Sequence, residues 1–148
     1  MTSFAQIYRL ALNEISNDYR ITKMFETSPN VAQDLLESWL FKGVALFQEY
    51  TEISLEESYD SANATFTVDL SFNIIKILSQ MVIMFWMEWN INNIVQMNLS
   101  LQDADYKRYS EERNLTGKVD YMNKYREIIY QDMTQMCLNQ AFRHGLLG

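Results

Sequence analysis

The stretch from Phe72 to Trp89 restricts the fold of this chain more than any other part of its sequence. Its apolar residues occupy most positions around a helix, so they cannot all lie on one stripe that faces a single neighbour. They are Ile74, Ile75, Ile77, Leu78, Met81, Val82, Met84, Phe85, Trp86 and Trp89. A helix of this kind needs cover on several sides, either from the chain's own core or from a neighbouring subunit. The candidate subunit-interface residues are Met81, Met84, Phe85, Trp86 and Trp89.

The same stretch is too short to cross a bilayer. Residues 77–87 are free of charge, but Lys76 and Glu88 bound them, whereas a spanning helix needs about 20 predominantly apolar residues. Near the N-terminus, Arg9 and Glu14 interrupt any apolar run of the kind that a secretory signal needs. We therefore expect no membrane partner and a protein that stays in the compartment where it is made.

Further helices are predicted where apolar residues recur at steps of three and four. Ser28 followed by Pro29 is a start signal, because the hydroxyl can accept an orphan amide and proline at the first helical position loses no hydrogen bond. Asn90–Asn93 and Thr116–Gly117 predict interruptions, because asparagine and glycine have weak helix propensity. Gly43 indicates either close packing against a neighbour or simple tolerance. The expected helices span residues 4–15, 29–48, 72–89, 103–115 and 118–140, and residues 19–25 offer a further short one.

Two segments break this helical pattern. Between Glu49 and Ala64 the period fails and the charge is acidic, which predicts a long acidic loop. Residues 64–70 alternate polar and apolar side chains of β-favouring types, which predicts a short extended segment. We therefore expect an all-α fold, a bundle of about four to five helices. Residues 1–140 form the single domain, and residues 141–148 form a C-terminal tail with two glycines.

Charge and cysteine content exclude several classes of function. The formal net charge of -7 opposes general binding to nucleic acid, because the chain as a whole repels phosphate. Cys137 is the single cysteine, so no intrachain disulfide and no multi-cysteine metal site can form, which fits a reducing compartment. We expect Cys137 to be a small apolar residue of a helix face.

The groups that catalysis would need are also scarce. His144 is the only histidine, and it lies in the expected tail. Adjacent carboxylates such as Glu56 and Glu57 point in different directions on a helix, so we expect them to be solvated charges. Asp103 and Asp105 resemble the start of a calcium loop, but its glycine and its distal glutamate are absent. We therefore expect no catalytic residue, no metal and no cofactor.

Half of the twelve basic residues lie in one stretch near the C-terminus, and two interpretations of them stay open. They are Lys107, Arg108, Arg113, Lys118, Lys124 and Arg126. One interpretation is an ordinary solvated helix face. The other is an electrostatic dock for an acidic partner surface, such as the region from Glu49 to Asp69 of a second copy. The second interpretation predicts self-association that weakens in salt.

About half of the chain resembles the small head-to-tail connector proteins, also called adaptor or neck proteins, of tailed bacteriophages. The resemblance lies in Phe66-x-x-Asp69-Leu70-Ser71, Ile75-x-Ile77-Leu78-x-x-Met81, Trp86 to Trp89, Asp105-Tyr106-Lys107-x-Tyr109-Ser110-Glu111, and Tyr125-Arg126. These are mostly aliphatic and aromatic positions. The chain departs from the family's pattern after Trp89, where related chains often carry a proline and this one has Asn90–Asn93.

This resemblance implies a structural protein of the virion at the head–tail junction. Such proteins form a ring, usually of about twelve copies, that docks on the portal protein and continues the DNA channel toward the next neck or tail protein. DNA passes through without sequence-specific binding. The C-terminal segment often reaches into the portal, and the corresponding portal-contact candidates here are Phe142, Arg143, His144, Leu146 and Leu147.

The acidic loop gains a possible role in such a ring. A channel wall that repels DNA would let it slide, whereas a basic wall would bind it at every phosphate. The lumen-facing acidic candidates are Glu49, Glu52, Glu56, Glu57 and Asp60.

Two other functions stay open from the sequence. The chain could be a small cytosolic adaptor or regulator that binds a partner peptide in a methionine-rich groove, because nine methionines and twenty aromatic residues supply large adaptable side chains. It could also be an enzyme whose site another chain completes. Native mass distinguishes the connector from the adaptor or regulator, and turnover of a substrate would indicate the enzyme.

Overall fold

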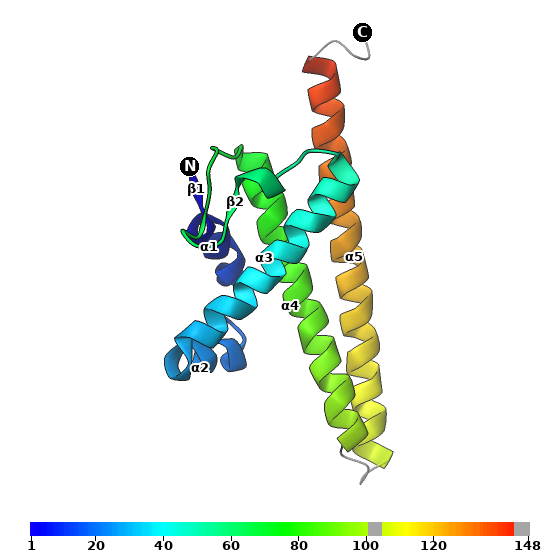
Figure 1. Cartoon of the computed structure of the whole chain (residues 1–148). Helices are drawn as coiled ribbons and strands as arrows, with labels where there is room; N and C mark the ends of the chain where they lie inside the picture. Colours follow the sequence, from blue (N-terminus) through cyan, green and yellow to red (C-terminus); the bar gives the residue numbers. More distant parts are fainter. Residues whose placement is uncertain (101–104, 144–148) are drawn as a thin grey trace.

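A computed structural model describes the backbone of residues 1–100 and 105–143 and the side chains of residues 1–93 and 115–142. Within these residues the fold is all-α, a helical bundle with one small sheet (Figure 1). The helices are α1 (Phe4–Ile15), α2 (Tyr19–Thr27), α3 (Pro29–Thr51), α4 (Phe72–Ser100) and α5 (Asp105–Arg143), with a short 3-10 turn at Glu56–Ser58. The strands are β1 (Thr2–Ser3), β2 (Tyr59–Asp60) and β3 (Thr65–Phe66).

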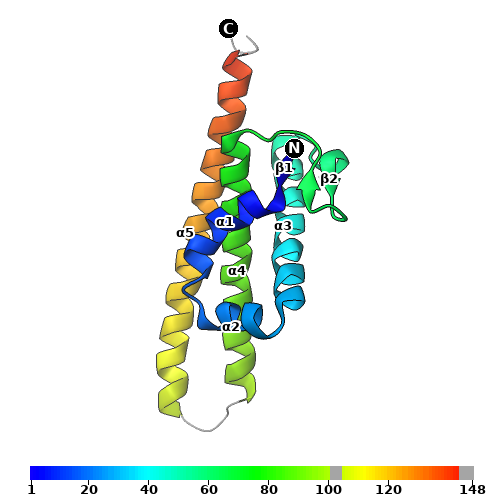
Figure 2. The same ribbon diagram turned by 90° about the vertical axis from the view of Figure 1, so that its left-hand side faces the viewer.

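The apolar helix α4 lies at the centre of the bundle. It contacts α1, α3 and α5, with α1 and α3 on different sides of it and α5 antiparallel beside it (Figure 2). Its fully or nearly buried side chains are Ile74, Ile77, Leu78, Met81, Val82, Ile83, Met84 and Met87. The chain's own helices therefore provide most of the cover that the sequence requires.

The predicted extended segment becomes β3, the middle strand of an antiparallel sheet with the order β1-β3-β2. Thr2 pairs with Phe66, and the Thr2 hydroxyl accepts a hydrogen bond from the Leu70 amide at 2.9 Å. Phe66 is fully buried and packs edge-on against Phe4, with ring centroids 5.3 Å apart. The sheet thus ties the start of the chain to the segment that leads into α4.

Local signals place most helix starts correctly. The Asp18 carboxylate accepts a hydrogen bond from the Arg20 amide at 3.0 Å and so caps α2. Pro29 is the first residue of α3, although the Ser28 side chain makes no cap hydrogen bond. Helix α3 continues beyond the predicted end near Gln48 and stops at Thr51, followed by Glu52 in the left-handed conformation with φ of 60°.

The predicted interruptions of the two long helices are wrong. Helix α4 continues through Asn90–Asn93 to Ser100, and α5 runs unbroken through Thr116–Gly117. The two helices pack along each other, and such packing outweighs a propensity penalty of about 1 kcal/mol for a single glycine. Helix α5 also includes the first residues of the expected tail and ends at Arg143, while residues 144–148 lie outside the described part of the chain.

Gly43 marks a close helix crossing, which decides between its two interpretations. A Cβ added at Gly43 would lie 3.2 Å from the Cβ of Met81, on the facing side of α4. Met81 itself is completely buried. A larger residue at position 43 would therefore force α3 and α4 apart.

One segment of α4, Phe72–Asn93, is long and apolar enough to cross a membrane by length and composition alone. The buried core helix of a globular protein meets the same criterion. Here 44% of the apolar window is buried inside the fold, and Lys76 and Glu88 interrupt it.

Candidate functional site

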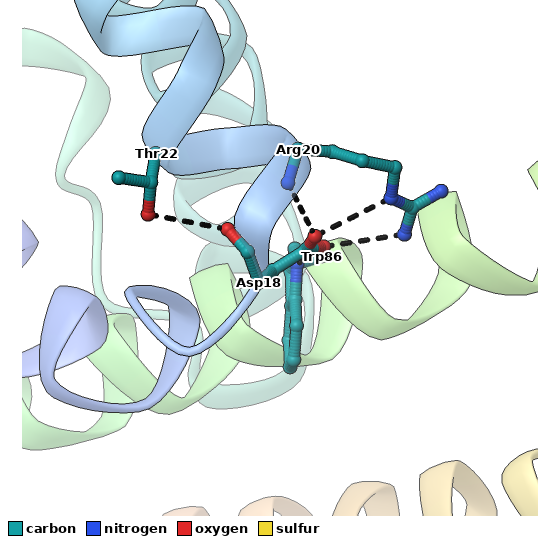
Figure 3. A network of polar contacts seen from close by, with 4 residues as sticks. All are labelled: Asp18, Arg20, Thr22 and Trp86. Atoms are coloured by element: carbon teal, nitrogen blue, oxygen red, sulfur yellow. Dashed lines mark hydrogen bonds and ion pairs between the residues drawn. The ribbon is translucent and has the colours of Figure 1, made fainter.

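A cluster of polar contacts around Asp18 joins the corner between α1 and α2 to the middle of α4 (Figure 3). Asp18 Oδ2 accepts hydrogen bonds from the Trp86 indole Nε1 at 3.0 Å and from Arg20 Nη2 at 3.2 Å. Asp18 Oδ1 accepts from Arg20 Nε at 3.3 Å and from the Arg20 amide. The Thr22 hydroxyl donates to the Asp18 carbonyl at 3.3 Å. One carboxylate therefore caps α2, forms an ion pair with an arginine and accepts a hydrogen bond from an indole.

The Arg20 guanidinium continues this cluster onto a second tryptophan. Its carbon Cζ lies 4.9 Å from the ring centroid of Trp89, which is a cation–π contact. Trp89 in turn meets Trp39 of α3 edge-on, with ring centroids 6.0 Å apart. The polar and aromatic contacts together hold α2, α3 and α4 in one arrangement.

Beside this cluster lies a surface groove of about 580 Å³, which we call the Gly117 groove. One wall is the corner between α1 and α2, the floor is α4 and the other wall is α5. Its lining residues are Asn17, Asp18, Arg20, Trp86, Met87, Asn90, Ile91, Gly117, Lys118 and Tyr121. The lining combines apolar and aromatic surface with amides and a lysine, which suits contact with another polypeptide surface.

The Gly117 groove contains no nucleophile paired with a base. Its one carboxylate, Asp18, already accepts from Arg20 and Trp86. Across the described residues, no group of three or more His, Cys, Asp or Glu side chains could hold a metal ion.

A second polar cluster lies between α3 and the sheet, around Glu37. Tyr59 donates a hydrogen bond from its hydroxyl to Glu37 Oε1 at 3.1 Å, and the Ser61 hydroxyl donates to the same oxygen. Burial raises the pKa of Tyr59 well above its usual range, and the nearby Glu37 carboxylate raises it further. The pKa of Tyr8 is raised in the same way, by burial first and then by Glu37.

The predicted subunit-interface residues lie largely inside the chain's own fold. The prediction is wrong for Met81 and Met84, because their exposed fractions are 0% and 2% and no neighbouring copy can reach them. Phe85 is partly buried, with the Lys42 ammonium 5.8 Å from its ring centroid. Trp86 and Trp89 are partly buried under Asp18 and Arg20. Sequence reasoning missed Asp18 and Arg20. The only signal was that Asp18, a residue type that commonly caps helices, precedes a short helix.

The predicted lumen-facing carboxylates differ in their surroundings. Glu49, Glu52, Glu56 and Glu57 are exposed, as a wall residue would be, and the face of a ring on which they lie stays a prediction. Asp60 is partly buried and binds Asn63, whose amide Nδ2 donates to it at 2.7 Å. This side-chain hydrogen bond, with a further one from the Asn63 backbone, lowers the pKa of Asp60. Asp60 therefore closes a turn within its own chain.

Two of the portal-contact candidates, Phe142 and Arg143, lie at the far end of α5, which projects beyond the ends of α3 and α4 in both views (Figures 1 and 2). Phe142 is 65% exposed, and Leu138, which sequence reasoning did not select, is 42% exposed. Arg143 is the last residue of α5. His144, Leu146 and Leu147 lie outside the described residues.

The basic cluster is only partly described. The side chains of Lys107, Arg108 and Arg113 lie outside the described residues, whereas Lys118 and Lys124 are exposed and Arg126 is partly buried. Lys118 forms no ion pair with a carboxylate of residues 1–93 or 115–142. It therefore presents its charge at the rim of the Gly117 groove.

Comparison with protein-family models, with curated protein sequences and with solved structures finds no match for this chain.

Proposed function

We propose that this chain is a virion structural protein of a tailed bacteriophage. It joins the portal protein at the head–tail junction to the next neck or tail protein, and copies of it form a ring through which DNA passes. The chain assembles in the host cytoplasm before it joins the virion. The resemblance in Phe66–Ser71, Ile75–Met81 and Trp86–Trp89 to connector proteins supports this function. The first segment runs from the end of the middle strand to the residue before α4, and the other two lie in α4, the last of them in the Trp86 cluster.

The observation that carries the proposal is the projecting end of α5. Its last turns extend past the bundle (Figure 1), and the apolar side chains of Leu138 and Phe142 are 42% and 65% exposed there. An exposed apolar helix end suits insertion into a groove of another protein. In a connector, that protein is the portal.

The experiment is native mass spectrometry of the full chain, alone and with the cognate portal. We expect a ring-sized species and a complex with the portal. Leu138→Ser and Phe142→Ser should weaken portal binding at least tenfold. The matched control is Val68→Ser, which removes a side chain that is 49% exposed in the linker before α4. A chain that stays monomeric and ignores the portal at high concentration contradicts the proposal.

A second candidate function, a regulator that binds a partner peptide, is favoured by the Gly117 groove. Its volume of about 580 Å³ and its Trp86–Met87 floor suit a short peptide or helix. A strict monomer that binds a helical peptide, and loses it when Trp86 is changed, would favour this function over the connector.

A further inference from the structure

We propose that the Gly117 groove receives the outer face of α3 from a neighbouring copy of this chain. The inference rests on the proposed ring and names the contact between its subunits. This contact takes the place of Met81 and Met84, which the sequence had predicted at the subunit interface. Four observations carry it: an unexplained glycine, an exposed face of α3, a charge pair and the positions of both surfaces on the bundle.

Packing against the described residues does not explain Gly117. A Cβ built at Gly43 meets Met81 at 3.2 Å, whereas one built at Gly117 meets nothing within 4 Å. Glycine inside a helix is unfavourable, and one benefit that offsets this cost is the close approach of another backbone. Gly117 is exposed and forms part of the groove wall. Its absent side chain leaves room for a partner helix.

The outer face of α3 has the matching shape. Val31, Asp34 and Ser38 lie at steps of three and four, so they share one face of the helix, and all three are exposed. Val31 is 56% exposed, so more than half of this apolar side chain is open to a partner. A valine side chain can enter the space beside a glycine at little entropic cost, because it already has one preferred rotamer in a helix.

The charges of the two surfaces are complementary. Lys118 stands next to Gly117 at the rim of the groove, without an ion pair to the described carboxylates. Asp34 lies one turn along α3 from Val31 and is also exposed. The Asp18 carboxylate in the groove is already neutralised by Arg20. The groove therefore offers a cation where the neighbouring α3 brings a carboxylate.

The two surfaces lie where a ring needs them. Figure 2 shows α5 and α3 on opposite sides of α4, with α2 beside the lower part of α4. Helix α2 contacts α3, and the residues just before and at its start line the Gly117 groove. Helix α5, which lines the groove, and helix α3 therefore lie on opposite sides of α4. A contact between two different surfaces is heterologous, and it forms a ring when the rotation from one copy to the next closes.

The first test is disulfide cross-linking of the full chain in which Cys137→Ala removes the native thiol. Copper-catalysed oxidation of the Val31→Cys/Tyr121→Cys chain, which leaves Gly117 in place and uses an exposed groove residue one turn away, should give a ladder of covalent oligomers on non-reducing gels. Each single-cysteine chain should give at most a dimer. A ring seen by native mass spectrometry without this ladder overturns the inference and leaves the connector function standing. A chain that stays monomeric with and without the portal overturns the inference, and one that also ignores the portal overturns the connector function as well.

The second test reverses the charges. Lys118→Glu and Asp34→Lys should each raise the concentration at which rings form at least tenfold, and the double variant should restore ring formation. Lys124→Glu is the matched control, because Lys124 is exposed on α5 but does not line the groove. Circular dichroism and the unfolding midpoint verify that each monomer is folded. Equal losses for Lys124→Glu and Lys118→Glu, or no rescue in the double variant, overturn the inference.

Discussion

The indole nitrogen of Trp86 lies 3.0 Å from Asp18 Oδ2, and this hydrogen bond joins two residues that are 68 positions apart in the chain. The Asp18 side chain is only 9% exposed. Its carboxylate holds the first residues of α2 against the middle of α4, and it also binds Arg20, which lies over Trp89. The two tryptophans that the sequence assigned to a subunit interface are thus held by polar residues of their own chain.

Asp18→Ala should lower the free energy of unfolding by about 2–4 kcal/mol. The change removes a helix cap, which contributes about 1 kcal/mol, and leaves the Trp86 N–H without an acceptor, which costs about 1–3 kcal/mol. Urea denaturation measures the loss. Asp18→Asn keeps a cap oxygen and should lose less than about 1 kcal/mol. Equal stability of wild type and Asp18→Ala would contradict the role of the cluster.

The same substitution at two glycines should have different effects. Gly43→Val should lower the free energy of unfolding by about 1–3 kcal/mol, because its side chain would press on Met81, whose Cβ lies within 3.2 Å of the added Cβ. Gly117→Val should change it by less than about 0.5 kcal/mol, because the added Cβ meets nothing within 4 Å. Denaturation at a concentration where the chain is monomeric makes the comparison.

Alkaline pH should destabilise the fold through Tyr8 and Tyr59. Burial and Glu37 raise the pKa of both phenols in the folded chain, whereas tyrosines of the unfolded chain ionise near pH 10. Their stabilisation is therefore complete below about pH 10 and is lost as the pH rises toward the folded-state pKa. The free energy of unfolding, measured from pH 8 to pH 11.5, should fall less steeply for Tyr8→Phe/Tyr59→Phe. Identical slopes would refute the assignment.

The two faces of α5 should respond differently to truncation. Met133 is fully buried, so Met133→Ala should cost about 2–5 kcal/mol. Phe142 is 65% exposed, so Phe142→Ala should leave the free energy of unfolding unchanged within about 0.5 kcal/mol. Thermal and urea unfolding both report the difference. A large loss for Phe142→Ala would mean that this side chain packs within its own chain, against the proposed docking role.

Helix starts were predictable because their signals are local. The Ser28–Pro29 pair that starts α3 acts within a few residues, and so does the alternating pattern around Phe66 that marks the strand β3. The continuity of α4 through Asn90–Asn93 and of α5 through Gly117 was not predictable from propensity, because packing between the two helices decides it.

The candidate site was predictable only in part, for the same reason. The apolar character of α4 indicated burial, but it could not say which copy of the chain supplies the cover. Met81 is covered by α3 at Gly43, and Trp86 is covered by Asp18. Both contacts join segments far apart in the chain, and no local pattern fixes such pairings. The groove around Gly117 likewise exists only once three helices meet.

Helix α5 has 39 residues without a break, so at about 1.5 Å per residue it measures about 58 Å from end to end. Such a continuous helix behaves as a stiff rod, and α4 braces it along much of its length. A displacement of Phe142 at one tip would tilt Tyr121 and Lys118 together with it. Binding of the portal at the Phe142 end of α5 would then be mechanically coupled to the contact between adjacent subunits at the Gly117 groove.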